Sequence, residues 1–154
     1  MSALSRDRNT KYVDRFHRDT VPVAQGVKIY NGGAVARNAA GYAVPAGTVA
    51  GRFCGIADET VDNTAGQDGD LNLAIRTPDG AYWAGSGLAA GDVDADVYFS
   101  TDQDVTKTAK LVYAGRIKTV VSSTECLVDH RGAYAGMTGR GTSLTTVAPT
   151  TSAL

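Results

Sequence analysis

Short apolar runs separated by glycine, asparagine, aspartate and proline recur along residues 21–130, at intervals of about 8–12 residues. The clearest pattern covers residues 71–75, where Leu71, Leu73 and Ile75 alternate with Asn72 and Ala74. Alternation with a period of two is typical of a β-strand that buries one face. No window of about twelve residues shows a sustained helical period, so the chain is predicted to be all-β.

Turn-forming residues divide the runs into predicted strands. Asn31-Gly32-Gly33 is a strong turn signal, and Pro78-Asp79-Gly80 predicts a turn after the alternating strand. We expect strands within 21–30, on both sides of 38–41, and within 48–57, 71–77, 81–85, 96–101, 110–123 and 125–130. In the 48–57 strand, Gly51 or Gly55 permits a local irregularity. Several short strands joined by turns predict a small β-sandwich or a β-barrel-like domain.

Three segments follow from this pattern. Residues 1–20 are polar and basic, and both a short amphipathic helix and an extended N-terminal arm fit them. Residues 21–135 form the predicted β domain. Residues 136–154 are rich in glycine, serine and threonine and contain no acidic residue, which predicts a flexible C-terminal tail.

Composition narrows the class of protein. The chain has 154 residues, which suits one domain, and its 18 glycines favour turns over long helices. No apolar run approaches the roughly 18 residues needed to cross a bilayer. The first residues lack the apolar centre of a secretory signal. We therefore expect synthesis in a cytoplasm and no membrane partner.

Charge is distributed unevenly along the chain. Residues 1–18 carry five basic and two acidic side chains, whereas residues 57–104 carry eleven acidic side chains and one basic one. An acidic face would repel nucleic acid and favour a basic protein surface. A solvated face that only improves solubility explains the same pattern equally well.

Candidate catalytic and metal-binding residues are few. Cys54 and Cys126 lie in apolar runs and are interpreted as free, buried thiols, while His130 is interpreted as a surface histidine. Ser86 lacks the first glycine of a hydrolase elbow and is assigned to a turn. Asp92, Asp94 and Asp96 do not fit the EF-hand pattern, which leaves open a different calcium site shared with the 58–70 loop. We predict no enzymatic activity, no cofactor and no dedicated metal site.

Four stretches resemble the small capsid decoration, or cement, proteins of tailed phages. They are residues 41–46 (Gly-Tyr-Ala-Val-Pro-Ala), 53–58 (Phe-Cys-Gly-Ile-Ala-Asp), the Asp-Asn loop 62–70, and 97–103 (Val-Tyr-Phe-Ser-Thr-Asp-Gln) with the 114–117 strand. The resemblance covers about residues 21–131 and contains no catalytic signature. The N-terminal 20 residues and the tail fall outside it.

The resemblance implies a structural protein on the outer surface of a virion, made in the host bacterium. The implied partners are the major capsid protein and further copies of the chain, with a trimer favoured, and no nucleic acid. We expect the N-terminal segment and the tail to contact the capsid lattice. The candidate binding residues are Arg6, Arg8, Lys11, Tyr12, Arg15, Phe16 and Arg18.

Two other functions remain open at the level of sequence. One is another virion component, such as a tail-tube or head–tail connector protein, since these also combine β-sandwiches with extended arms. The other is a carbohydrate-binding β-domain, for which exposed aromatic residues beside carboxylates would be needed. Tyr82 and Trp83 beside Asp79 are the candidates for such a sugar-binding surface.

Overall fold

The computed structural model describes residues 2–135. Within that range the chain forms eleven strands and two short helical turns. The strands are β1 (Tyr12–Pro22), β2 (Lys28–Ile29), β3 (Ala34–Arg37), β4 (Ala43–Pro45), β5 (Arg52–Ala57), β6 (Val61–Asp62), β7 (Asn72–Ala84), β8 (Asp96–Phe99), β9 (Val105–Thr106), β10 (Tyr113–Ser122) and β11 (Glu125–Asp129). The helical turns are η1 (Ala90–Asp92) and α1 (Arg131–Tyr134).

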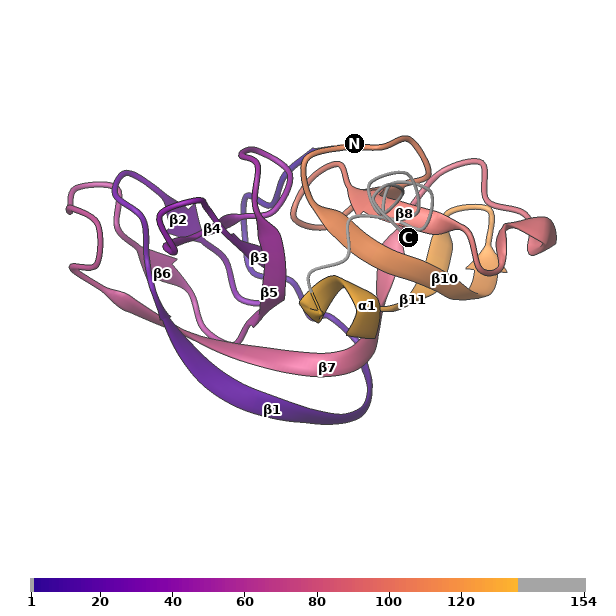
Figure 1. Cartoon of the computed structure of the whole chain (residues 1–154), viewed down its shortest axis with the longest axis horizontal. Coiled ribbons are helices and arrows are strands. Elements are labelled where there is room, and N and C mark those ends of the chain that lie inside the picture. The colour runs from indigo at the N-terminus through magenta and orange to yellow at the C-terminus, as the bar shows by residue number, and fades with distance from the viewer. Residues whose placement is uncertain (1, 136–154) are drawn as a thin grey trace, which may run out of the picture.

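The predicted all-β, barrel-like fold is confirmed. Nine strands form one sheet in the order β4-β3-β5-β7-β11-β10-β8-β9, with β1 also paired to β7. Each of these strand pairings is antiparallel. The sheet curls into a half-barrel, and β2 pairs with β6 in a small second sheet at one end of the molecule (Figure 1).

Strand β7 joins the two halves of the sheet. One of its edges pairs with β1 over nearly its whole length. Its other edge pairs first with β5, at Ile75 and Arg76, and then with β11, from Gly80 to Ala84. In Figure 1, β1 and β7 accordingly run together as two long curved ribbons beneath the other strands.

The turn predicted at residues 78–80 is wrong, because this segment continues β7. Pro78 lies where β7 changes partner from β5 to β11 and opposite a register shift in β1, so both ladders are already irregular there. Its missing N–H is tolerated at such a position. A Cβ atom on Gly80 would lie 2.7 Å from the Val128 carbonyl oxygen, so glycine permits β11 to approach. Turn-forming residues therefore bend a long strand here and do not end it.

Two apolar cores lie at the two ends of β7. The smaller one includes Val21, Val35, Leu73 and Ile75. The larger one is built around Trp83 together with the aromatic and aliphatic residues of β5, β8, β10 and β11. Between the two cores, Thr77 and Asp79 are not buried. The chain therefore has a polar waist between two packed lobes.

A hydrogen-bonded relay crosses the larger core. The indole Nε1 of Trp83 donates to Nε2 of His130 at 2.8 Å. The other ring nitrogen, Nδ1, lies 2.6 Å from the carbonyl oxygen of Ala114, which can only accept. These two bonds fix His130 as the neutral tautomer protonated at Nδ1. Phe53, Phe99 and Tyr134 pack around the imidazole, with ring centroids between 4.6 and 6.2 Å away.

His130 is therefore buried, and its prediction as a surface residue is wrong. Its exposed fraction is 0%. Desolvation by burial lowers the pKa of His130 to about 4. The sequence suggested exposure because His130 directly follows a predicted strand, where a polar residue usually faces water.

The glycine irregularity predicted in the 48–57 strand occurs at Gly55. This residue has a φ of +153°, and the register between β3 and β5 shifts beside it. A Cβ atom at this position would lie 2.6 Å from the Arg76 carbonyl oxygen. Gly55 therefore combines a backbone angle that favours glycine with a close approach to β7.

The N-terminal segment forms part of the β fold. Residues 12–22 form β1, so an extended conformation, not a helix, is found within the predicted arm. The preceding residues are hydrogen-bonded to the body of the protein. The Leu4 N–H donates to Asp102 at 2.8 Å, and the Gln103 side chain donates to the Ser2 carbonyl at 2.7 Å. The predicted C-terminal tail, 136–154, lies outside the described residues.

Acidification should destabilise the protein through His130. An unfolded imidazole titrates near pH 6.5, whereas the folded pKa is about 4. Between these values the unfolded state binds a proton that the folded state excludes, so stability falls as the pH falls from 6.5 to 4. From pH 7 to pH 5 we expect His130 to account for a loss of about 2 kcal/mol. Urea unfolding at both pH values measures it.

The matched control for this experiment is His130→Gln. The glutamine amide can accept from Trp83 and donate to Ala114, but it does not titrate. This variant should lose the part of the pH dependence due to His130. An unchanged difference between pH 7 and pH 5 in the variant would contradict the assignment.

Replacing Gly55 should destabilise the fold strongly. We expect Gly55→Ala to lower the free energy of unfolding by at least about 2 kcal/mol, because alanine meets both an unfavourable φ and the Arg76 carbonyl. Gly91→Ala is the control, since nothing lies within 4 Å of its added Cβ. Chemical denaturation of both variants tests this, and equal effects would refute the role of Gly55.

Candidate functional site

The predicted binding residues of the N-terminal segment have different environments. Arg8 belongs to the fold: its guanidinium lies 4.8 Å from the centre of the Trp83 ring. The same side chain donates to Thr10 Oγ1 at 2.6 Å and to the Tyr82 carbonyl at 3.3 Å. Cation–π stacking and hydrogen bonds of this kind stabilise a side chain in one conformation. Arg8 therefore fastens the N-terminal segment to the larger core.

Three of the remaining predicted residues have exposed side chains. The side chains of Arg6, Lys11 and Arg18 are exposed, and Arg18 Nε lies 3.7 Å from Asp58. Tyr12, Arg15 and Phe16 belong to β1 by their backbone. The structure thus places all seven residues on one continuous stretch of chain, with three basic side chains exposed along it.

A second candidate site, the waist cleft, lies between the two cores. It has a volume of about 340 Å³ and was not predicted from the sequence. β7 lies in the middle, with β1 on one side and β5 and β3 on the other. The lining residues are His17 and Asp19 from β1, Ile75, Thr77 and Asp79 from β7, Arg37, Arg52, Phe53 and Cys54 from β3 and β5, and Tyr134 from α1.

Most of the side chains around this cleft are polar or charged, but its base is apolar. Phe53 and Ile75 are each 1% exposed. The Tyr134 hydroxyl donates to the Pro78 carbonyl at 2.8 Å, which holds α1 against β7. A rigid apolar base with charged side chains above it is typical of binding sites, because burial gives affinity and charge gives orientation.

The Cys54 thiol lies in the waist cleft but is chemically quiet. Burial raises its pKa to about 12, although Arg37 and Arg52 favour the thiolate. Its Sγ lies 3.4 Å from the Val35 carbonyl. Burial also raises the pKa of Cys126 to about 11. Both cysteines are free, as predicted, and neither is a thiolate nucleophile at neutral pH.

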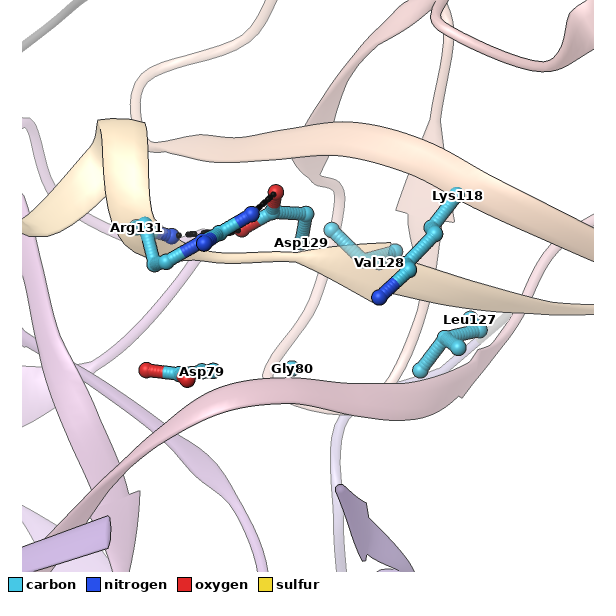
Figure 2. A pocket seen from close by; sticks show the side chains of 7 residues that line it. All are labelled: Asp79, Gly80, Lys118, Leu127, Val128, Asp129 and Arg131. Atoms are coloured by element: carbon cyan, nitrogen blue, oxygen red, sulfur yellow. Dashed lines mark hydrogen bonds and ion pairs between the residues drawn. The ribbon is translucent and has the colours of Figure 1, made fainter. Parts of the chain in front are cut away.

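A smaller recess adjoins the waist cleft at Asp79, which lines both. It lies where β7 meets β11, and Figure 2 shows its seven lining residues. Arg131 lies flat against Asp129, with Nη2 2.8 Å and Nε 3.0 Å from the carboxylate oxygens. Lys118 extends from β10 across β11 toward β7 (Figure 2). At about 50 Å³ the recess is too small for more than a few atoms.

The acidic residues of 57–104 do not form one face. The loop between β6 and β7 lies at one end of the long axis, and η1 lies at the other (Figure 1). Many of the carboxylates are bonded within the fold: Glu59 accepts from the Ala74 N–H, and Asp68 accepts from the Gln25 N–H, both at 2.8 Å. Other carboxylates also have partners within the fold. Asp58 forms an ion pair with Arg76 and Asp92 forms one with Lys107, while Asp70, Asp96 and Asp102 accept hydrogen bonds from Gln67, Tyr113 and Leu4.

This arrangement excludes the shared calcium site considered from the sequence. The 58–70 loop and the segment that holds Asp92, Asp94 and Asp96 lie too far apart to bind one ion (Figure 1). Within residues 2–135, no group of three histidine, cysteine or acidic side chains could hold a metal ion.

The proposed sugar-binding aromatic is also absent from the surface. Trp83 is 0% exposed, because its ring fills the larger core between Phe99 and His130. Tyr82, the next residue on β7, is half-buried. Asp79 therefore has no exposed tryptophan beside it on which a sugar ring could stack.

We find no match to this chain among protein-family models, curated proteins or solved structures. In the described part of the chain, no helix has the length and apolar character needed to span a membrane. The N-terminal segment and the waist cleft are therefore the two candidate sites of this protein.

The different roles of two neighbouring arginines can be tested by stability. Arg8→Ala should lower the free energy of unfolding by about 1–2 kcal/mol, because it removes a cation–π contact and two hydrogen bonds. Arg6→Ala is the matched control and should change it by less than about 0.5 kcal/mol, since Arg6 is exposed. Equal losses in guanidinium unfolding would argue against an anchoring role of Arg8.

Proposed function

We propose that this protein is a non-enzymatic binding module that attaches to the outside of a phage capsid and stabilises it, as a decoration protein does. The single observation that carries the proposal is the N-terminal edge, a stretch of chain that is bonded to the fold at both ends and carries exposed basic side chains. It runs from Ser2 through β1 to Pro22.

The two ends of this edge are fixed to the body of the protein. Hydrogen bonds from Leu4 and to Ser2 hold its start, and the pairing of β1 with β7 holds its end. Residues 17–20 are exposed on both faces of β1. In the described residues β1 pairs only with β7, so its second edge is open and presents backbone donors and acceptors to a neighbouring chain.

The charges along the edge favour a protein partner with acidic side chains. Arg6, Lys11 and Arg18 are exposed on it. Basic side chains on such a rim accelerate encounter and set orientation more than they add affinity. The affinity would come from strand pairing and from binding several subunits at once.

Stabilisation of the capsid shell would follow from thermodynamic linkage between binding and assembly. A protein that binds the assembled shell, but not its free subunits, shifts the assembly equilibrium toward the shell by mass action. This mechanism needs a rigid scaffold and no reacting group. It agrees with a chain whose buried histidine and thiols are held in unreactive, neutral forms.

The test is to mix the purified protein with cognate empty shells that lack it. We expect co-sedimentation with the shells, density on their outer surface by electron microscopy, and a higher shell melting temperature. Density on tails or connectors instead would favour the other virion role, and absence of binding to any particle would refute the proposal.

Charge reversal at the exposed edge sharpens this test. Arg6→Glu together with Lys11→Glu should weaken shell binding at least about tenfold without altering the unfolding midpoint. Lys110→Glu, an exposed lysine outside the edge, is the control. Equal binding by both variants in a sedimentation titration would exclude the N-terminal edge as the contact.

A further inference from the structure

The waist cleft holds two basic and two acidic side chains that form no ion pair with one another. Its cations lie on the β3–β5 side, and its anions lie on β1 and β7. No carboxylate in residues 2–135 forms an ion pair with Arg37 or Arg52 in the structure. The cleft therefore has two sides of opposite sign that do not neutralise each other.

The basic side is a pair of directly opposed arginines. Arg37 on β3 and Arg52 on β5 are cross-strand partners, so their side chains leave the sheet on the same face. Like charges in this position destabilise a sheet unless a counter-charge lies between them. Arg37 donates to the Gly41 carbonyl at 3.2 Å. Two guanidinium groups side by side are well suited to hold one carboxylate.

The acidic side consists of Asp19 and Asp79. Asp19 Oδ1 accepts from the Thr20 N–H at 2.8 Å, and Asp79 extends into the cleft from β7. Asp19, Arg37 and Arg52 line this cleft together with the Cys54 thiol. Ile75 and Phe53 supply the buried apolar base beneath them.

We propose that the waist cleft binds an extended peptide segment that carries an acidic and a basic side chain at adjacent positions. The acidic side chain lies between Arg37 and Arg52, and the basic one lies against Asp19 and Asp79. In an extended peptide, consecutive side chains point to opposite sides. A peptide that follows β7 therefore presents adjacent residues to the two sides of the cleft.

The mixed charge selects a peptide over a free anion. Phosphate or a multiply charged acid would be attracted by the arginine pair but repelled by the two carboxylates. A neutral peptide would leave both sides unpaired. The volume of about 340 Å³ is within the range of small ligand sites.

Two short peptides test this spacing by amide NMR titration of the full chain. In acetyl-Thr-Glu-Lys-Thr-amide the charged residues are adjacent, whereas in acetyl-Thr-Glu-Thr-Lys-amide they are two apart and point to one side. We expect the first to shift amides of Asp19, Arg52 and Thr77 at about 1 mM and the second to bind at least about fivefold more weakly.

Variants identify the groups responsible. Arg52→Gln should weaken binding of the first peptide about tenfold, and Asp79→Asn should do the same. Arg52 and Asp79 are exposed, so neither substitution should change the unfolding midpoint. Lys110→Gln is the control, and this variant should bind the first peptide as tightly as the unsubstituted protein does. Equal affinity for the two peptides, equal binding of inorganic phosphate, or no shifts at 10 mM peptide would each overturn the proposal.

We assign this peptide to a subunit of the capsid, and only this assignment rests on the proposed function. Peptide binding is measured on the isolated protein and shell binding on particles. If the protein binds the first peptide but no shell, the peptide-binding proposal stands and the capsid role is refuted. If it binds shells but not the peptide, the capsid role stands and the peptide-binding proposal is refuted.

Discussion

The neutral imidazole of His130 is the interaction on which the architecture depends. It accepts a hydrogen bond from Trp83 on β7 and donates one to Ala114 on β10, and it does so at complete burial. A charged ring could not accept from the indole and would have to be desolvated. The relay therefore holds two strands, which are not direct neighbours in the sheet, at one separation and one orientation. The aromatic rings of β5, β8 and α1 pack against this fixed point.

From this fixed core, β7 extends into a second, purely aliphatic core. The strand changes partner at its middle, and the change leaves a polar waist where neither core covers it. The same discontinuity therefore explains Pro78 within a strand, the exposed Asp79 and the cleft beside it. The change of partner within β7 therefore accounts for the waist cleft between the lobes.

The sequence was sufficient for the fold class and for several local features. Alternation at 71–75 identified part of β7, and the glycines of the 48–57 run predicted an irregularity at Gly51 or Gly55, which the structure places at Gly55. These signals are local, since each depends on backbone angles and on which face of a strand is buried. The errors arise where long-range contacts decide: Pro78 to Gly80 resembles a turn until β11 is placed beside it, and His130 resembles a surface residue until Trp83 is placed beneath it. The waist cleft has no local signal at all, because Arg37, Arg52, Asp19 and Asp79 meet only through the pairing of β1, β3, β5 and β7.

The order in which the strands pair also constrains how the chain folds during its synthesis. β1 pairs with a strand that begins about fifty residues later, the start of the chain is tied to Asp102 and Gln103, and the aromatic core is complete only when His130 has been added. A nascent chain on the ribosome thus carries an unpaired β1 until residues 72–81 of β7 have been made. Folding must wait for nearly all of the described sequence, and topologies with such distant pairings close slowly. During that interval the unfolded chain is most prone to associate with other copies of itself or to be bound by chaperones.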